Sequence, residues 1–122
     1  MIKFDHMSLP VSSPEASRDW YVTNLGFRIE FEIPERRTYA LVDDADFTIF
    51  VYPATGALGD SRPAFTLRVG DVEAKHAELV AKGATFLSAP AKQYWGYGAE
   101  LDDPDGYRLM LWDEASMRQK GS

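Results

Sequence analysis

The alternation of hydrophobic and polar residues predicts the same series of elements twice along the chain. Residues 14–24 and 72–82 each follow a good N-cap residue and stop at a glycine, which predicts two helices. A period of two elsewhere predicts strands, and one strand ends just before each helix, at Leu9–Val11 and at Leu67–Val69. The other expected strands are 27–31, 37–42 and 47–52 in the first half, and 84–88, 98–101 and 107–112 in the second.

The predicted order is therefore β-α-β-β-β, repeated once. The first module covers residues 2–52, the second covers residues 63–112, and the linker 53–62 joins them. The polar tail that begins at Asp113 is expected to add one helical turn. Because 122 residues is the length of one domain, we expect a single α+β domain that spans residues 1–122.

Short motifs open and close the chain. They are His6-x-x-Leu9-x-Val11, then Trp20-Tyr21 and Leu25-Gly26-Phe27, and finally Asp103-Pro104-Asp105-Gly106 before the last strand. These motifs resemble the vicinal oxygen chelate superfamily, the group of glyoxalases, bleomycin-resistance proteins and extradiol dioxygenases, over nearly the whole chain. The resemblance implies that the two modules form a cup-shaped, incompletely closed mixed sheet, with the helices outside and a ligand inside.

The resemblance also implies where a metal would sit in the members that use one. Four side chains from the first and last strands of the modules hold it, and the matching positions here are His6, Phe50, Ala64 and Met110. His6 alone is a suitable ligand for a catalytic divalent metal, so we expect no metal, no cofactor and no catalytic residue of the family type. A displaced pair, His6 with Glu100, stays open, although it falls short of three protein ligands.

Strand alternation indicates which side chains line the cup. The resulting surface is aromatic and apolar with a few polar groups, which is typical of a small-molecule pocket. Planar or cationic ligands suit such a surface through stacking and cation–π contacts. Trp95, which lies between tyrosines and glycines, is expected to act as a lid. The candidate ligand-binding residues are His6, Tyr39, Phe50, Tyr52, Trp95, Arg108, Met110 and Trp112.

The leading functional hypothesis is a metal-free binding protein that sequesters an aromatic or cationic compound, as in antibiotic resistance. The Trp95-Gly96 segment resembles the bleomycin-resistance branch, whose members sequester a drug without a catalytic metal. One alternative is a metal-dependent lyase, isomerase or dioxygenase relative with a rearranged metal site. A further alternative is a regulatory domain whose pocket is vestigial.

Composition limits the remaining classes of partner. With 13 basic and 19 acidic residues the net charge is −6, which argues against a nucleic-acid partner. No apolar run is long enough for a membrane span, and the acid near the start is unlike a signal peptide, so we expect a cytoplasmic protein. The absence of cysteine excludes disulfides and thiolate metal sites. Sheet edges that need cover, together with the resemblance, favour a homodimer.

Overall fold

The computed structural model describes residue 1 and residues 4–59 and 63–122. Residues 2–3 of the predicted first module and residues 60–62 of the predicted linker lie outside the described residues. The chain divides into two compact units, residues 1–60 and residues 61–122. Each unit contains one β-α-β-β-β repeat, so the α+β class and the duplicated element order are confirmed.

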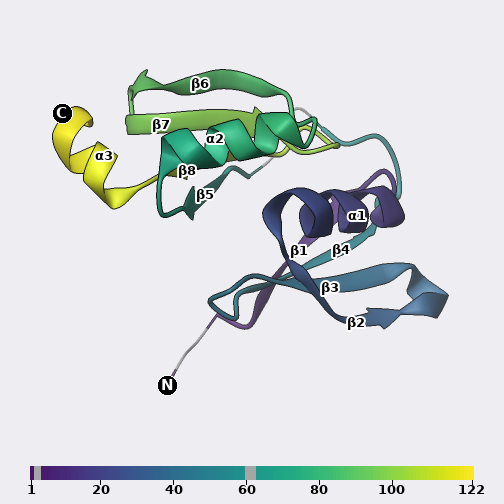
Figure 1. Ribbon diagram of the computed structural model, residues 1–122. Coiled ribbons are helices and arrows are strands. Elements are labelled where there is room, and N and C mark those ends of the chain that lie inside the picture. Colours follow the sequence, from purple (N-terminus) through teal and green to yellow (C-terminus); the bar gives the residue numbers. More distant parts are fainter. Residues whose placement is uncertain (2–3, 60–62) are drawn as a thin grey trace. The chain divides into compact units, whose positions relative to one another are not determined.

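Unit 1 is a four-stranded mixed sheet with one covering helix (Figure 1). Its elements are β1 (His6–Val11), α1 (Pro14–Leu25), β2 (Arg28–Ile33), the short 3-10 helix η1 (Pro34–Arg36), β3 (Thr38–Val42) and β4 (Thr48–Pro53). The strand order is β1-β4-β3-β2, in which β1 runs parallel to β4 and the other neighbours are antiparallel. Helix α1 packs on one face of this sheet, against β3 and β4.

Unit 2 repeats this topology and adds a helix at its end. Its elements are β5 (Phe65–Arg68), α2 (Val72–Ala81), β6 (Phe86–Gln93), β7 (Gly96–Asp102), β8 (Arg108–Trp112) and α3 (Glu114–Lys120). The strand order is β5-β8-β7-β6, which matches that of unit 1 strand for strand. Neither sheet closes into a barrel within the described residues. The two mixed sheets thus have the architecture that the sequence predicts.

The strand register supports the sequence alignment of the two modules. Ser8 lies opposite Phe50 in unit 1, and Thr66 lies opposite Met110 in unit 2. Phe50 and Met110 are therefore equivalent positions. The same equivalence follows when the sequences of the two modules are aligned so that Leu9 matches Leu67.

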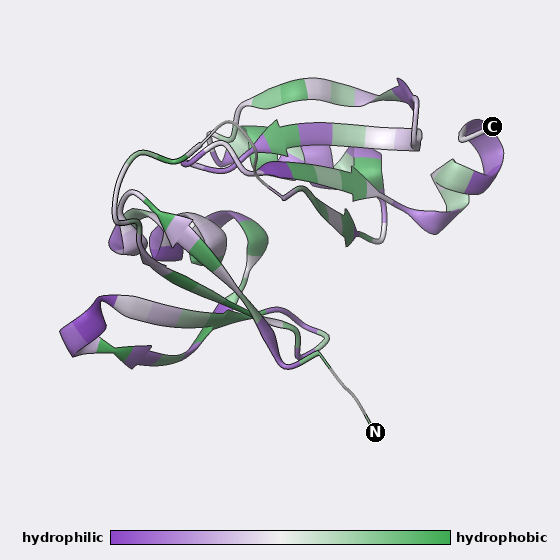
Figure 2. Ribbon diagram, turned by 180° about the vertical axis from the view of Figure 1, so that it is seen from behind, coloured by the Kyte–Doolittle hydropathy of each residue, from purple (hydrophilic) through white to green (hydrophobic). Residues whose placement is uncertain are grey.

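Each sheet has one face buried under its helix and one open face. On the buried face lie Leu9, Val11, Ile49 and Val51 in unit 1 and Ala99, Leu101, Leu109 and Leu111 in unit 2, none of which is more than 5% exposed. The intervening residues, such as Phe50 and Met110, are half-buried on the open face. Figure 2 shows this alternation as hydrophobic and hydrophilic bands that follow one another along the strands.

The helix ends and hairpin turns follow the residues that favour them. Ser13 and Asp71 accept hydrogen bonds from Ala16 N–H and Ala74 N–H as N-caps of α1 and α2. Gly26 takes the left-handed conformation at the end of α1, with φ of 72°. The carboxylates of Asp43 and Asp103 fix equivalent hairpin turns by accepting hydrogen bonds from backbone N–H groups: Ala45 and Phe47 in one, Asp105 and Tyr107 in the other.

Unit 2 differs from the sequence prediction in three details. Helix α3 has seven residues, about two turns, where the tail is expected to add one turn. Strand β6 runs to Gln93 rather than ending at residue 88, and its interior contains Pro90. An edge strand tolerates this proline, because one side of the strand has no hydrogen-bonding partner, and the register with β7 shifts around it. Tyr94 and Trp95 then form the turn between β6 and β7 instead of a long loop. No helix in the described part of the chain is long and apolar enough to cross a membrane.

Candidate ligand-binding pocket

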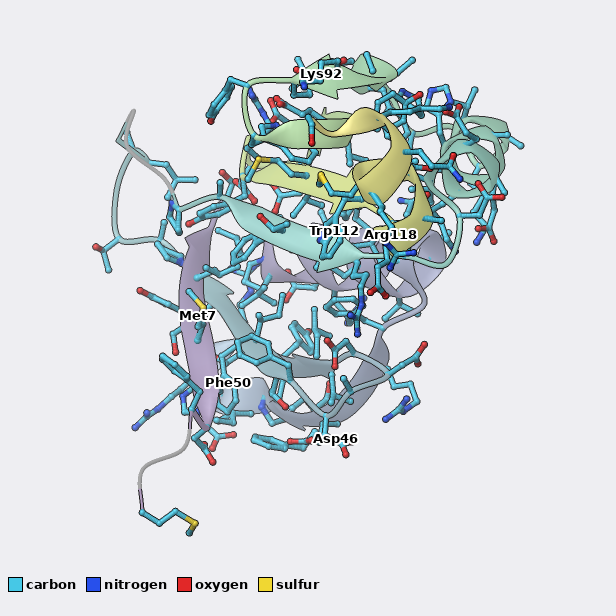
Figure 3. All side chains as sticks on the ribbon, turned by 90° about the vertical axis from the view of Figure 1, so that its left-hand side faces the viewer. Met7, Asp46, Phe50, Lys92, Trp112 and Arg118 are labelled. Carbon is cyan, nitrogen blue, oxygen red and sulfur yellow. The ribbon has the colours of Figure 1, made fainter. Side chains whose placement is uncertain are left out.

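A pocket of about 330 Å³ opens on the face of the unit 1 sheet that α1 does not cover. Strands β1, β3 and β4 supply the floor, and the β2–β3 connection supplies one wall. The described residues that line the pocket are Ser8, Ile33, Arg36, Thr38, Phe50, Tyr52 and Pro53. Phe50 and Tyr52, both predicted from the sequence as ligand contacts, thus lie in one pocket; Phe50 is labelled in Figure 3.

Phe50 belongs to an aromatic cluster on this open face. The His6 ring stacks on the Phe50 ring, with 4.0 Å between the centroids and 19° between the planes. Phe31 meets the same ring edge-on at 5.5 Å. The His6 Nδ1 lies 2.8 Å from Asp5 Oδ2, which orients the imidazole. His6 is therefore a neighbour of the pocket through Phe50, while it is absent from the lining residues.

The wall of the pocket is a tight corner between β2 and β3. Pro34 begins the single turn of η1, a position that its fixed φ favours. Arg37 then takes a left-handed conformation, with φ of 48°, and the chain reverses into β3. The Thr38 hydroxyl donates to the carbonyl of Arg36 across this corner, at 3.1 Å. The corner places Arg36 and Thr38 beside each other in the pocket lining.

Glu15, in the first turn of α1, holds the same corner from the covered side of the sheet. Its carboxylate accepts from Arg37 Nη2 at 2.5 Å and from Arg37 Nε at 3.2 Å, and it accepts from the Tyr39 hydroxyl at 3.1 Å. The hydrogen bond from Arg37 is the main reason why the pKa of Glu15 falls to about 2. Glu15 is consequently ionised at neutral pH, and the ion pair with Arg37 persists.

Tyr39 does not join the other candidate residues of unit 1. It lies opposite Val51 in the β3–β4 pair, so its side chain is on the face that α1 covers. There its ring lies under the Arg18 guanidinium at 4.7 Å, and its hydroxyl donates to Glu15. Burial, followed by the hydrogen bond to Glu15, raises the pKa of Tyr39. The structure places this residue behind the pocket as a support of the corner.

The open face of unit 2 carries a paired polar cluster around Glu100. The Glu100 carboxylate accepts from Trp95 Nε1 at 2.8 Å and from Arg108 Nη1 at 3.1 Å. Arg108 Nε also donates to Asp102 at 2.6 Å, which is the main reason why the pKa of Arg108 is raised. Trp95 lies against its own sheet, because a Cβ added at Gly98 would meet the Trp95 ring at 2.5 Å.

Met110 and Trp112 lie on β8 of the same open face, as the alternation predicts. They pair with Thr66 and Arg68 of β5, and both are half-buried. Trp112 is labelled in Figure 3. They are the unit 2 equivalents of Phe50 and Tyr52, because the two parallel strand pairs have the same register.

The side chains at the family's metal positions do not fit a metal ion. His6 supplies one imidazole, whereas Phe50 and Ala64 supply no donor and Met110 supplies a soft thioether. Glu100, the displaced alternative, is already bound to Trp95 and Arg108. Among the residues that the structure describes, no three His, Asp or Glu side chains gather closely enough to hold a metal ion.

Several pocket residues were absent from the sequence-based candidates. They are Ser8, Ile33, Arg36, Thr38 and Pro53. The place of Thr38 on the open face could have been predicted from the register of the β3–β4 hairpin. The hydrogen bond between Asp43 and Phe47 closes the turn and thereby sets that register. Arg36 had no such signal, because its position depends on the left-handed turn at Arg37.

Comparison with known proteins agrees with this fold. The family model described as Glyoxalase/Bleomycin resistance protein/Dioxygenase superfamily matches residues 3–111. The chain belongs to this superfamily. No curated protein matches the chain at a significant level.

Several solved structures are similar to this chain over most of its length. TnmS3, an antibiotic binding protein from Streptomyces sp. CB03234, is 28% identical, with a TM-score of 0.75; the match covers 93% of this chain and 96% of TnmS3. A glyoxalase/bleomycin resistance protein from the same strain is 30% identical, with a TM-score of 0.67 and coverage of 86% and 95%. A superfamily member from Sphaerobacter thermophilus DSM 20745 is 25% identical, with a TM-score of 0.70 and coverage of 93% and 98%.

Proposed function

We propose that this protein is a metal-free small-molecule-binding protein that sequesters an aromatic compound, in the manner of antibiotic resistance. The observation that carries the proposal is the pocket of about 330 Å³ in which Phe50 and Tyr52 lie together. Aromatic walls of this kind bind planar ligands by stacking and by burial of apolar area. The likeness to TnmS3, an antibiotic binding protein, supports the same role.

Of the aromatic and cationic ligands that the sequence favours, the pocket supports the aromatic class. Arg36 lines the pocket and repels a cation. Trp95, Arg108, Met110 and Trp112 of unit 2 stay predicted ligand contacts. The cytoplasmic location, the single domain over residues 1–122 and the lack of a nucleic-acid partner also stay predictions.

The proposal is tested by a thermal-shift screen against a panel of planar aromatic compounds. A compound that binds should raise the melting temperature, because binding to the folded state alone stabilises it. The hit should be lost in Tyr52→Ala and kept in Tyr94→Ala, a change at a tyrosine that is 96% exposed in the β6–β7 turn. A panel that produces no Tyr52-dependent hit contradicts the proposal.

Metal analysis separates this proposal from the enzyme alternative. Protein purified without a tag and then dialysed is expected to carry well under one equivalent of zinc, manganese, iron or nickel. The reason is that Phe50, Ala64 and Met110 stand where carboxylate or imidazole ligands would be needed. Stoichiometric metal that disappears in His6→Ala would overturn the metal-free binding proposal and favour the rearranged metal site.

We also propose that the protein is a homodimer. Strand β2 is an edge of its sheet, and it exposes Ile29 and Phe31 by 48% and 44%. Covering an edge strand and its apolar side chains stabilises a protein against unspecific association. Light scattering at tens of micromolar is expected to give twice the chain mass of 13.7 kDa. A monomer alone at that concentration would reject the dimer.

A further inference from the structure

The unit 1 pocket carries a charge that its aromatic character does not explain. Among the described residues that line it, Arg36 is the charged one, beside the hydroxyls of Ser8 and Thr38 and the rings of Phe50 and Tyr52. A guanidinium on an otherwise apolar and aromatic wall points to a ligand with an oxygen group of complementary charge.

Within residues 4–59 and 63–122, Arg36 differs from most arginines because no carboxylate there pairs with it. Ion pairs or hydrogen bonds to Asp or Glu occupy Arg18, Arg28, Arg37, Arg108 and Arg118. In the described part of the chain, Arg36 and Arg68 are the arginines without an ion pair. The chain has 19 acidic residues against 13 basic ones, so internal partners are plentiful. An arginine that stays unpaired at a pocket is available to a ligand.

The main chain of Arg36 is held in place before any ligand arrives. The next residue, Arg37, donates through two nitrogens to Glu15. The Thr38 hydroxyl donates to the Arg36 carbonyl itself, at 3.1 Å. Such a pre-formed corner reduces the conformational entropy that binding would otherwise cost.

We infer that Arg36 determines the ligand specificity of this pocket and that the ligand is a planar aromatic carboxylate. This inference rests on the proposed function and narrows its ligand class. The planar guanidinium binds a carboxylate through two parallel hydrogen bonds, while Phe50 and Tyr52 contact the attached ring. A neutral ring compound keeps only the second interaction, and an ammonium compound is repelled.

Three probes that share one ring system test the inference: 2-naphthoate, 2-naphthamide and 2-naphthylmethylammonium. Calorimetric titration of the full chain at low ionic strength is expected to give a tenfold or greater preference for 2-naphthoate over 2-naphthamide, with the ammonium probe weakest. In Arg36→Ala the affinity for 2-naphthoate should fall by about tenfold, a value reduced for solvent screening at an open pocket. The affinity for 2-naphthamide should stay within about threefold.

Matched variants separate charge recognition from general damage. Arg118→Ala removes an exposed arginine from α3, where it pairs with Glu114, and should leave all three affinities unchanged. Arg36→Lys keeps the charge but not the planar fork, so it should fall between the wild type and Arg36→Ala.

Two kinds of failure are distinguishable. Binding that needs Tyr52 but does not prefer the carboxylate, or an equal loss for 2-naphthoate and 2-naphthamide in Arg36→Ala, overturns the inference and leaves the aromatic-binding function standing. If none of the three probes binds, or if Tyr52→Ala does not change their binding, both the inference and the aromatic-binding function are overturned.

Discussion

Tyr52→Ala is expected to weaken binding of an aromatic ligand by about 2–4 kcal/mol, which corresponds to a loss of roughly 30-fold to 1,000-fold in affinity. Tyr52 lines the unit 1 pocket at the end of β4, next to Phe50 along the same face. Removal of its ring takes away both stacking and buried apolar area at a central contact. The affinity is measured by titration of the best compound from the aromatic panel.

The stability of the fold should hardly change in Tyr52→Ala, which makes the variant informative. The side chain is 36% exposed, whereas its neighbour Val51 on the opposite face is fully buried. Phe50 is a less suitable test because its ring also packs against His6 and Phe31. Tyr94→Ala is the matched control, and it should keep the full affinity. Equal affinity in both tyrosine variants would place the ligand away from the pocket.

Much of the fold follows from local signals that each module carries twice. The N-caps Ser13 and Asp71 and the Asp43 turn act through hydrogen bonds to nearby backbone, so the sequence alone reveals them. Alternation along one strand then sorts its residues between the two faces. Alternation needs one position whose face is known, and the family resemblance supplies it by placing Phe50 and Met110 at positions that face the ligand.

The site was harder to predict because it depends on register between strands and on a turn. The sequence-based candidates include Tyr39, but its pairing with Val51 of β4 puts it on the covered face, and a register shift of one residue would reverse that face. Arg36 reaches the pocket because Arg37 adopts a left-handed conformation, which arginine rarely takes. Glu15 of α1 stabilises that conformation from a distance of 22 residues. Such a contact has no local sequence signal.

Asp113→Ala is expected to lower the free energy of unfolding by about 2–4 kcal/mol. Asp113 is 3% exposed at the end of β8, where its carboxylate accepts three hydrogen bonds. Two come from the N–H and hydroxyl of Ser116 and cap α3; the third comes from Val72 N–H at 2.7 Å and joins β8 to the start of α2. Alanine leaves the buried Val72 N–H without an acceptor. Urea unfolding at pH 7 measures the loss.

The same contacts give this effect a defined pH dependence. Burial raises the pKa of Asp113, but the hydrogen bonds from Ser116 and Val72 outweigh burial and hold the pKa below its usual value of 3.8. A carboxylate whose pKa is lower in the folded state stabilises the fold above its unfolded pKa and loses that contribution as the pH falls through the folded pKa. The difference in stability between wild type and Asp113→Asn should therefore be full at pH 7 and 5 and shrink toward pH 3.

Asp71→Ala is the matched control for the loss of a helix cap. Asp71 also caps α2, but it is exposed and its side chain accepts one backbone hydrogen bond, from Ala74 at 3.1 Å. Its replacement should cost about 0.5–2 kcal/mol, less than the replacement of Asp113, because no buried donor loses its partner. Equal losses in the two alanine variants would show that Asp113 acts only as a cap of α3. A larger loss of stability in Asp113→Ala than in Asp71→Ala, together with loss of the pH dependence in Asp113→Asn, would assign the difference to the hydrogen bond between Asp113 and the start of α2.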